Sequence, residues 1–521
     1  MKPRKSLQNT IKTLLLAGIS VFFLAGCSAT KTPTNQGADG IVTFKFIQLN
    51  DVYEIAPLSG GKIGGMERVA YVRDSIKAQN PNTFMFLAGD FLNPSLLGTV
   101  KYQGERIRGK QMIEVMNAMG FDLVTFGNHE FDIGKEPLQQ RLNESTFQWM
   151  SCNVKEVTEN GNRPYRIQRD IGDVAIPASL VQRVAETDGD QITIGFVGST
   201  IPSNPQDFVH YDDIYTSVEK VNNELKQNGV DIVFGLTHLE IEQDSELARR
   251  IPDIPFIMGG HEHHNMRVEV GNSVITKADA NAKTIYIHTL TYNMNTKYLK
   301  IDSHLMPIDE TVPSDPEVKA IVDRWNEVLL TEIQSVVSDP NEVIYKTKIP
   351  LDGTDSASRG VQTNLGAIIT HAMAIAFDTP AEAALVNGGS IRIDDMLAGD
   401  VTSLDIFRVL PFGGHVVKVD IKGDLLIKVL DYGKSQGGNG AYLQRYNFMQ
   451  DGKGSWLIGQ KRIEDGGTYN VALSDFLLKG FDIPFLTPEN PGVLNVYEPT
   501  VNEPASDIRK AVIDYIKTLT E

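Results

Sequence analysis

The chain has 521 residues, of which 41% are hydrophobic and 22% are charged. These values are ordinary for a globular protein, and the length exceeds one typical domain, so two domains are expected and three are allowed. The formal net charge of −17 excludes a broad basic surface for a nucleic-acid backbone. We therefore expect no polymeric DNA or RNA partner.

The N-terminus has the layout of a bacterial lipoprotein signal peptide. A basic stretch precedes an apolar run at about residues 14–23, which is too short to span a bilayer. The run ends in a Leu-Ala-Gly-Cys sequence that resembles a lipobox and makes Cys27 the residue that receives lipid. An ordinary secretory signal or an uncleaved anchor is the alternative. We predict a signal peptide at 1–26, a polar tether at 27–40, and anchoring to a bacterial membrane outside the cytoplasm.

Two details refine this prediction. Ser28 after the cysteine favours the outer membrane and the periplasm in a cell with two membranes. The other cysteine, Cys152, has no disulfide partner once Cys27 carries lipid. We predict that Cys152 is a buried strand residue, with a reactive thiol as the alternative.

From about residue 42, short apolar runs alternate with helical stretches, which is typical of a layered α/β domain. Five apolar runs are each followed by polar residues and most by glycine. Because open α/β sheets bind ligands at the carboxyl ends of their strands, we expect these five loops to form one site. The runs and the residues after them are 44–49 with Asn50 and Asp51, 84–88 with Gly89 and Asp90, 123–126 with Gly127, Asn128, His129 and Glu130, 232–236 with Thr237 and His238, and 256–258 with Gly259, Gly260, His261, Glu262 and His263.

A second α/β domain follows a linker. Polar and proline-rich sequence near 307–315, followed by an amphipathic pattern to about 337, predicts a helical connection. Beyond it we predict strands near 384–386 and 416–421, helices near 363–377 and 423–432, and a glycine-rich loop at 437–440 without evident chemistry. The predicted boundaries are 41–310 for the first domain, 311–343 for the linker, and 344–521 for the second domain.

The loops of the first domain carry a set of potential metal ligands. Divalent cations bind carboxylates, amide oxygens and neutral imidazoles, and a bridging carboxylate can hold two ions about 4 Å apart. Each residue alone is weak support, because an aspartate after a strand is usually a helix cap and a single histidine is usually hydrogen-bonded. The candidates are Asp51, Asp90, Asn128, His238, His261 and His263.

The order of the loops, Asp, Gly-Asp, Gly-Asn-His-Glu, His and Gly-His-X-His, matches the five-block signature of the metallophosphoesterase superfamily. With the C-terminal motifs below, the chain resembles the bacterial 5′-nucleotidase and UDP-sugar hydrolase family over nearly all of its mature length. The resemblance implies a four-layer α/β sandwich metallophosphoesterase domain joined by a helix to a C-terminal α/β 5′-nucleotidase-type domain. Catalysis is then expected to need closure of one domain on the other.

The resemblance also implies two divalent ions, from among Zn, Mn, Co, Fe and Mg, and a hydroxide activated between them. The implied ligands are Asp51, Asp90 and His263 for the first ion, and Asp90, Asn128, His238 and His261 for the second, with Asp90 as the bridge. Tyr53 stands where the family commonly has a histidine. We expect Tyr53 to pack or to contact a metal-bound water rather than to bind the metal, because a phenol has a pKa near 10.

His129 and Asp132 resemble the catalytic pair of the family. The resemblance implies that His129 stabilises the transition state and the leaving oxygen, while Asp132 orients the imidazole and raises its basicity. The alternative is that His129 supports a metal ligand.

The second domain supplies the implied substrate site. Arg392, in a sequence like the family's Asn-X-Gly-Gly-X-Arg block, and Arg359 would hold the phosphate. A further arginine of the family is Asp355 here, which changes the phosphate clamp. The alternative for both arginines is a surface position without function.

Aromatic residues complete this site. Phe412 and Phe476 resemble the pair that stacks on the nucleobase, and Asp482 resembles the acid beside the ribose or base. Gly414 replaces an asparagine that commonly touches the base, so the base pocket is altered. Core packing is the alternative for both phenylalanines.

The resemblance implies hydrolysis of nucleoside 5′-monophosphates, with UDP-sugars as further substrates. A 2′,3′-cyclic nucleotide phosphodiesterase, or another phosphoesterase with the same ions, is the nearest alternative. A catalytically weak ligand-binding lipoprotein is the alternative from another class, supported by Tyr53, Asp355 and Gly414 and opposed by the intact histidine blocks. The sequence carries no signal for the oligomeric state.

Overall fold

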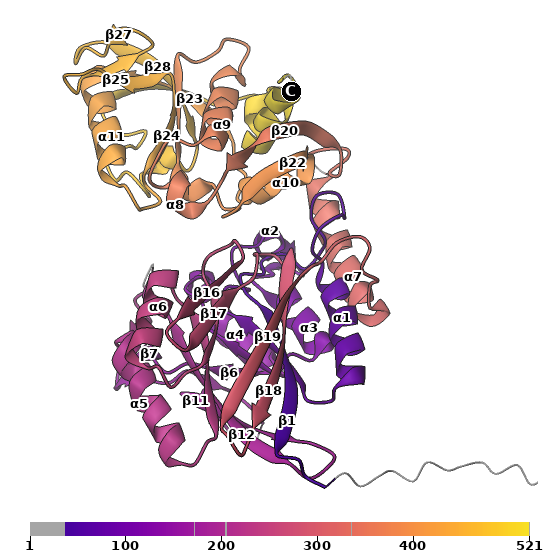
Figure 1. The fold of residues 1–521 in the computed structure, drawn as a ribbon. Helices are drawn as coiled ribbons and strands as arrows, with labels where there is room; N and C mark the ends of the chain where they lie inside the picture. Colours follow the sequence, from indigo (N-terminus) through magenta and orange to yellow (C-terminus); the bar gives the residue numbers. More distant parts are fainter. Residues whose placement is uncertain (1–36, 171, 204–205, 335, 520–521) are drawn as a thin grey trace, which may run out of the picture.

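The computed structural model describes residues 37–519 except 171, 204–205 and 335. The predicted signal peptide and its lipidation residue Cys27 lie outside the described residues. The described chain forms an N-terminal lobe (residues 41–307) and a C-terminal lobe (343–519) that are joined by one long helix (Figure 1). No helix in the described ranges is both long and apolar enough to cross a membrane.

The first sheet of the N-terminal lobe has the strand order β19-β18-β1-β2-β5-β6. Strands β1, β2, β5 and β6 are parallel, and β18 and β19 continue the sheet in antiparallel fashion. The bounds are β1 (Ile41–Leu49), β2 (Thr83–Ala88), β5 (Leu123–Thr125), β6 (Gln148–Met150), β18 (Thr284–Asn293) and β19 (Tyr298–Pro307).

The second sheet has the order β11-β12-β14-β15-β17-β16, with β12, β14, β15 and β17 parallel. The bounds are β11 (Ser179–Ala185), β12 (Gln191–Thr200), β14 (Ile232–His238), β15 (Phe256–Gly260), β16 (Met266–Val270) and β17 (Ser273–Lys277). In both sheets, therefore, the parallel strands end at a common edge where their loops can meet.

Side-chain alternation in β1 explains how the layers assemble. Phe44 and Phe46 point between the two sheets, whereas Ile47 and Leu49 pack with the helices on the outer face. Between the sheets, Phe46 packs against Phe234 of the second sheet with ring centroids 5.2 Å apart. This gives a helix–sheet–sheet–helix order and confirms the predicted four-layer sandwich (Figure 1).

Helices cover the outer faces of both sheets. Helices α1 (Met66–Gln79), α3 (Lys110–Met119) and α4 (Lys135–Glu144) pack on the first sheet. Helices α5 (Ile214–Gln227) and α6 (Ile241–Arg250) pack on the second. Shorter elements of this lobe are α2 (Leu96–Thr99), β3 (Lys101–Tyr102), β4 (Glu105–Arg106), the 3-10 turn His129–Ile133, β7 (Val154–Thr158), β8 (Gly161–Arg163), β9 (Arg166–Ile167), β10 (Val174–Ala175) and β13 (Val209–Tyr211).

The predicted linker helix is α7 (Pro316–Ile333). Its start follows from the sequence, because the Asp315 carboxylate accepts hydrogen bonds from the N–H groups of Glu317 and Val318, and proline occupies the first turn. The helix ends at Ile333, earlier than the expected position near 337. It packs against α1 and α3, so the connection belongs to the helical layer of the N-terminal lobe.

The C-terminal lobe has a five-stranded mixed sheet of order β24-β21-β28-β23-β29. Helices α9 and α12 pack on one face and α11 on the other. The bounds are β20 (Val343–Asp352), α8 (Asp355–Ser358), α9 (Asn364–Ile375), β21 (Ala383–Asn387), β22 (Met396–Thr402), α10 (Ser403–Val409), β23 (Val416–Lys422), α11 (Gly423–Ser435), β24 (Leu443–Tyr446), β25 (Phe448–Gln450), β26 (Trp456–Ile458), β27 (Lys461–Arg462), β28 (Thr468–Ser474), β29 (Val493–Tyr497) and α12 (Ile508–Ile516).

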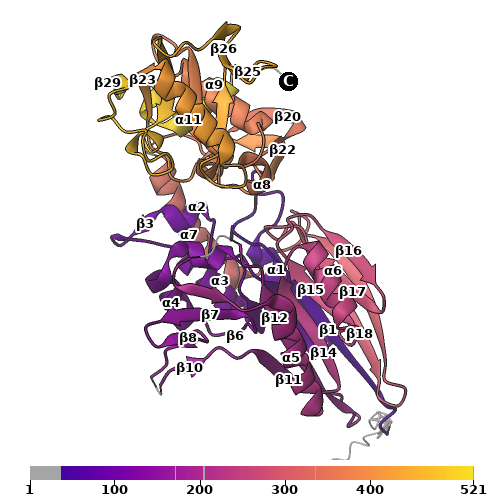
Figure 2. The same cartoon turned by 90° about the vertical axis from the view of Figure 1, so that its left-hand side faces the viewer.

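The two lobes face each other through short elements. Helix α8 lies on the side of the C-terminal lobe that looks toward α2 of the N-terminal lobe (Figures 1 and 2). Polar contacts cross between the lobes, including Lys62 to Asp400 at 3.0 Å and the hydroxyl of Thr99 to the carbonyl of Pro411 at 3.4 Å. The loops after the parallel strands are therefore covered by the C-terminal lobe.

Candidate active site

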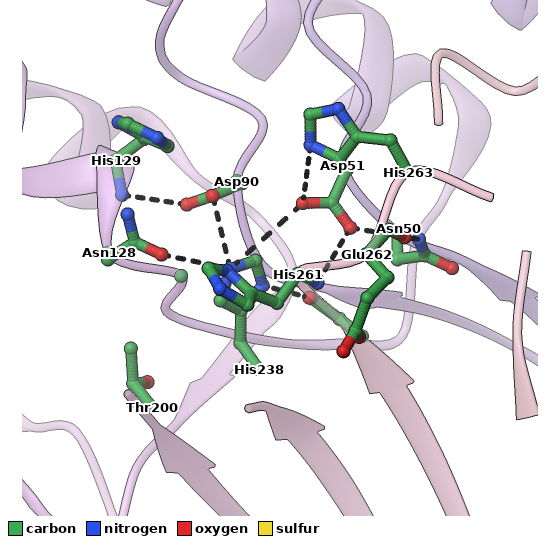
Figure 3. Close-up of polar contacts among 12 residues, drawn as sticks. Asn50, Asp51, Asp90, Asn128, His129, Thr200, His238, His261, Glu262 and His263 are labelled. Atoms are coloured by element: carbon green, nitrogen blue, oxygen red, sulfur yellow. Dashed lines mark hydrogen bonds and ion pairs between the residues drawn. The ribbon is translucent and has the colours of Figure 1, made fainter. Parts of the chain in front are cut away.

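The loops after β1, β2, β5 and β15, together with the end of β14, come together at one end of the sandwich (Figure 3). Asp51, Asp90 and His238 are buried, and one ligand atom of each lies within 4.8 Å of the others. His238 is the last residue of β14 rather than a residue of the following loop. The structure thus brings together groups that are far apart in the sequence.

His238 is at the centre of this cluster. Its Nε2 atom lies 3.1 Å from a carboxylate oxygen of Asp90, 3.2 Å from the amide oxygen of Asn128 and 4.0 Å from Asp51. The His261 ring is next to the His238 ring, with centroids 5.3 Å apart. The main-chain N–H of His261 donates to the Asp51 carboxylate at 2.9 Å. Five of the six residues assigned to the two ions from the sequence thus lie together here. The sixth, His263, has its Nε2 atom 3.5 Å from the Asp51 carboxylate.

The charges of the cluster fit a divalent cation. Burial opposes ionisation of Asp51, but His238 and His263 hold the pKa of this carboxyl well below its usual range. Although burial favours a neutral imidazole, Asp90 and Asp51 raise the pKa of His238 to about 9, so a cation that binds between these carboxylates would have to displace this proton. Burial and the neighbouring His238 lower the pKa of His261 to about 4, which keeps it neutral as a ligand must be. Such a donor set is one that divalent metals bind.

The backbone of the cluster is strained. Asp51, Asp90 and His261 have φ angles of 53°, 57° and 85°, a region that costs non-glycine residues about 1–3 kcal/mol each. The turn after β5 needs glycine for a different reason, since a Cβ at Gly127 would lie 2.1 Å from a carboxylate oxygen of Asp90. Strain of this kind persists where the surrounding structure fixes side chains for a function.

Tyr53 hydrogen-bonds the predicted ligands of the first ion. The Tyr53 hydroxyl is 2.9 Å from Nε2 of His263 and 3.4 Å from Asp51. Burial and the carboxylate of Asp51 raise the pKa of Tyr53 well above its usual value, so the phenol is neutral. The other ring nitrogen of His263 contacts the main-chain carbonyl of Asp394, a residue of the C-terminal lobe. His263 is therefore held from both lobes.

His129 and Asp132 form a hydrogen-bonded pair beside the cluster. Nδ1 of the His129 ring lies 2.7 Å from the Asp132 carboxylate, and the main-chain N–H of His129 donates to the Asp90 carboxylate at 2.7 Å. Burial disfavours a charged imidazole, but Asp90 and Asp132 raise the pKa of His129 to about 10. Asp132 is also 3.4 Å from the guanidinium of Arg392, which reaches across from the C-terminal lobe.

A cavity of about 680 Å³ opens next to this pair, and its wall contains all of the substrate residues predicted from the sequence. Phe412 is 60% exposed and Phe476 is 39% exposed, so core packing does not account for these rings. Phe476 also packs against Phe481 in a tilted arrangement, with ring centroids 5.4 Å apart. The predicted residues in the cavity wall are Arg359, Arg392, Phe412, Phe476 and Asp482.

Neighbouring residues shape the same cavity. Asn387 donates to Asp482 at 2.6 Å, and burial raises the pKa of this acid. A side chain at Gly414 would collide with Asp475, 2.5 Å from its Cβ. The glycine-rich loop, for which the sequence predicts no chemistry, contributes Gly440 to the cavity wall and ties Gly438 to the Arg359 carbonyl at 2.8 Å.

Two family models match the chain. Residues 44–265 match the calcineurin-like phosphoesterases, and residues 343–487 match the C-terminal domain of 5′-nucleotidases. The chain belongs to the metallophosphoesterases that carry a 5′-nucleotidase C-terminal domain. It is a metal-dependent hydrolase of phosphoric esters.

Other proteins are similar over most of this metallophosphoesterase. Bovine 5′-nucleotidase is 27% identical over 73% of this chain and 69% of its own length. A trifunctional nucleotide phosphoesterase of Bacillus subtilis is 27% identical over 78% of this chain and 30% of its own length.

Solved structures share the fold. A 5′-nucleotidase precursor from Thermus thermophilus aligns with a TM-score of 0.64 at 24% identity, over 91% of this chain and 96% of that one. A sulfate thiohydrolase from Thermus thermophilus aligns with a TM-score of 0.59 at 14% identity, over 91% and 94%. The same fold thus occurs in proteins that are named for different substrates.

Two buried charges that support the metallophosphoesterase site have no role predicted from the sequence. Glu130 is fully buried and accepts N–H hydrogen bonds from Gly127 at 2.5 Å, Asp90 at 2.9 Å and Phe91 at 2.7 Å, which joins the loops after β2 and β5. Burial and Asp90 raise the pKa of Glu130 to about 7. In the sequence, the position of Glu130 directly after His129 is the feature that could have indicated this supporting role.

Lys277 supports the opposite side of the site. It is 0% exposed at the end of β17, and its ammonium donates to the Leu239 carbonyl at 2.6 Å, lies 3.0 Å from Asp244 and contacts Glu262. Glu262 stands between His261 and His263 in the chain, so Lys277 holds the loop that carries both histidines. The sequence shows little sign of this role, because Lys277 ends a short strand that also contains Ser273 and Thr276.

Proposed function

We propose that the chain hydrolyses phosphate esters of nucleotides with two divalent metal ions. The proposed ligands are those assigned to the two ions from the sequence, with Asp90 as the bridge. One observation carries the proposal: a single cavity holds two exposed phenylalanines and two arginines of the C-terminal lobe next to the His129–Asp132 pair and the buried cluster of the N-terminal lobe.

Each group has a proposed task. Bound divalent ions supply Lewis-acid stabilisation of the phosphate and acidify a water molecule that serves as the nucleophile. Asp132 accepts the Nδ1 hydrogen of His129 and fixes the ring, so that Nε2 can donate to the leaving oxygen. Arg359 and Arg392 bind the phosphate through their planar guanidinium groups.

The other half of the substrate would lie against the aromatic rings. Phe412 and Phe476 stack on the base, and Asp482, held by Asn387, accepts hydrogen bonds from the ribose or base. The names of the bovine and Bacillus relatives support nucleotide substrates. A 2′,3′-cyclic nucleotide phosphodiesterase is a second candidate, which the placement of Asp355 next to Arg359 favours.

We further propose that the enzyme works outside the cytoplasm and is held on a membrane through lipid at Cys27. The support is the arrangement of basic, apolar and lipobox residues in the sequence. Labelling of cells with a radioactive fatty acid, followed by comparison with a Cys27→Ala variant, tests the anchor directly.

A substrate panel tests the function. The form that starts after Cys27 is assayed for phosphate release from AMP and UMP, and for product formation from UDP-glucose, 2′,3′-cyclic AMP and bis(p-nitrophenyl) phosphate, with Mn²⁺, Zn²⁺ or Co²⁺ and without metal. Asp90→Ala is the control, because it removes the proposed bridging ligand. Metal-dependent turnover of a nucleotide that is lost in Asp90→Ala supports the proposal. Absence of nucleotide turnover with every metal would favour a ligand-binding lipoprotein.

A further inference from the structure

Two acidic residues of the C-terminal lobe stand at the phosphate end of the cavity. Asp355 begins α8 and Asp394 follows the loop of Arg392. A carboxylate oxygen of each lies within 4.8 Å of the other and of a ring nitrogen of His129. Their side chains are only 19% and 15% exposed, so solvent screens their charges weakly.

These acids already face the groups that would bind phosphate. Asp355 forms an ion pair with Arg359 at 2.6 Å. Asp394 accepts the N–H of Asp355 at 2.8 Å and lies 3.4 Å from Nε2 of His263. Arg392, the second arginine of the proposed clamp, lies 3.4 Å from Asp132. Each guanidinium therefore meets a carboxylate before any substrate arrives.

The carboxylates that already pair with Arg359 and Arg392 should distinguish phosphate monoesters from phosphodiesters by their charge. A monoester carries between one and two negative charges near neutral pH, whereas a phosphodiester carries one. The second charge of a monoester would lie close to the Asp355 carboxylate, which is largely shielded from solvent, so the two like charges would repel. A diester satisfies the same arginines without this repulsion.

We infer that Asp355 makes the phosphate site selective for nucleotides with one negative charge on each phosphorus, namely phosphodiesters such as cyclic nucleotides and pyrophosphates such as nucleotide sugars, over phosphate monoesters. The inference rests on the proposed function, because it takes Arg359 and Arg392 to hold the phosphate. In the reaction, water forms a new P–O bond, the P–O bond to the leaving group breaks, and the leaving oxygen takes up a proton. The monoester product gains negative charge beside Asp355, which speeds its release.

The test compares two synthetic esters with the same leaving group. For wild type and Asp355→Asn, kcat/KM is measured on bis(p-nitrophenyl) phosphate and on p-nitrophenyl phosphate with saturating metal. Removing the charge is expected to lower the diester-to-monoester ratio about tenfold or more. Asp323→Asn is the matched control, because Asp323 also pairs with a basic residue four positions away, Lys319, but lies exposed on α7. It should leave the ratio unchanged.

Two further measurements distinguish an electrostatic effect of Asp355 from misfolding and from loss of metal. Asp355→Ser, together with thermal unfolding curves of both variants, shows that a ratio change does not reflect misfolding. A ratio within twofold of wild type in folded variants would overturn the inference. So would a loss of one bound metal per chain in Asp355→Asn, because the acids would then be metal ligands. Cleavage of the synthetic esters without turnover of any nucleotide would overturn the proposed substrate class, and the ratio would still measure the effect of Asp355.

Discussion

Replacing Lys277 by methionine should destabilise the N-terminal lobe strongly. The ammonium group is fully buried and forms ion pairs with Asp244, which is 0% exposed, and with Glu262. Methionine fills nearly the same volume, so the main effect is the loss of the charge. Leaving buried carboxylates without their partner costs about 3–5 kcal/mol in the free energy of unfolding.

The assay is urea unfolding of wild type and variant, followed by tryptophan fluorescence and circular dichroism. We expect the unfolding midpoint to fall by the equivalent of about 3–5 kcal/mol. In the double variant Lys277→Met with Asp244→Asn, part of this stability should return, because one of the uncompensated carboxylates is removed. Metal affinity, measured by calorimetry, should fall as well, since the loop of His261 and His263 loses its tether.

A matched surface change provides the control. Lys300→Met removes an exposed ion pair with Asp302 at 2.6 Å and should leave the unfolding midpoint unchanged. The reasoning about Lys277 would be refuted by a loss below about 1 kcal/mol in Lys277→Met, or by an equal loss in both variants, because a buried ion pair is expected to matter far more than an exposed one.

Three other outcomes follow from single side chains. Phe412→Ala should raise KM for AMP about tenfold while leaving KM for ribose 5-phosphate unchanged, because only the base loses its stacking partner; equal effects would contradict stacking. Burial lowers the pKa of His288 to about 3, so the unfolded state alone takes up a proton below pH 6.5 and stability falls as the pH decreases. His288→Gln should remove about 2 kcal/mol of the loss between pH 6.5 and 4.5, and unchanged pH dependence in urea titrations would exclude this cause. Burial raises the pKa of the Cys152 thiol to about 12, so iodoacetamide at pH 8 should label it about 100-fold more slowly than in 8 M urea; equal rates would show an accessible thiolate.

The arrangement of the strands and the meeting of Asp51, Asp90 and His238 agree closely with the prediction from the sequence. The apolar run at 44–49, followed by Asn50 and Asp51, predicts a strand with polar residues at its end, and the structure extends this strand to Ile41–Leu49. Asp51 and Asp90 each stand two positions after the last residue of a strand, and the carboxyl ends of parallel strands share one edge. Local periodicity therefore suffices to predict that these carboxylates meet.

Some local predictions needed correction because burial depends on what packs above an element. Cys152 lies in the loop after β6 and is partly buried, rather than within the strand as expected. His238 closes β14 instead of following it. Exposure of Phe412 likewise depends on the shape of the cavity between elements, which periodicity does not report.

The sequence by itself determined the layered α/β fold class and the order of the loops that follow the strands, because these depend on residue type and short-range spacing, whereas the roles of the two arginines are implied by the resemblance to the 5′-nucleotidase family. Only the tertiary structure decided which charged side chains lie next to one another. Asp394 meets His263 across the two lobes, and Lys277 meets Asp244 from a different element, so neither pair has a local signature. Electrostatic selectivity arises from distances of a few ångströms in a poorly solvated space, and those distances exist only once the two lobes have packed together.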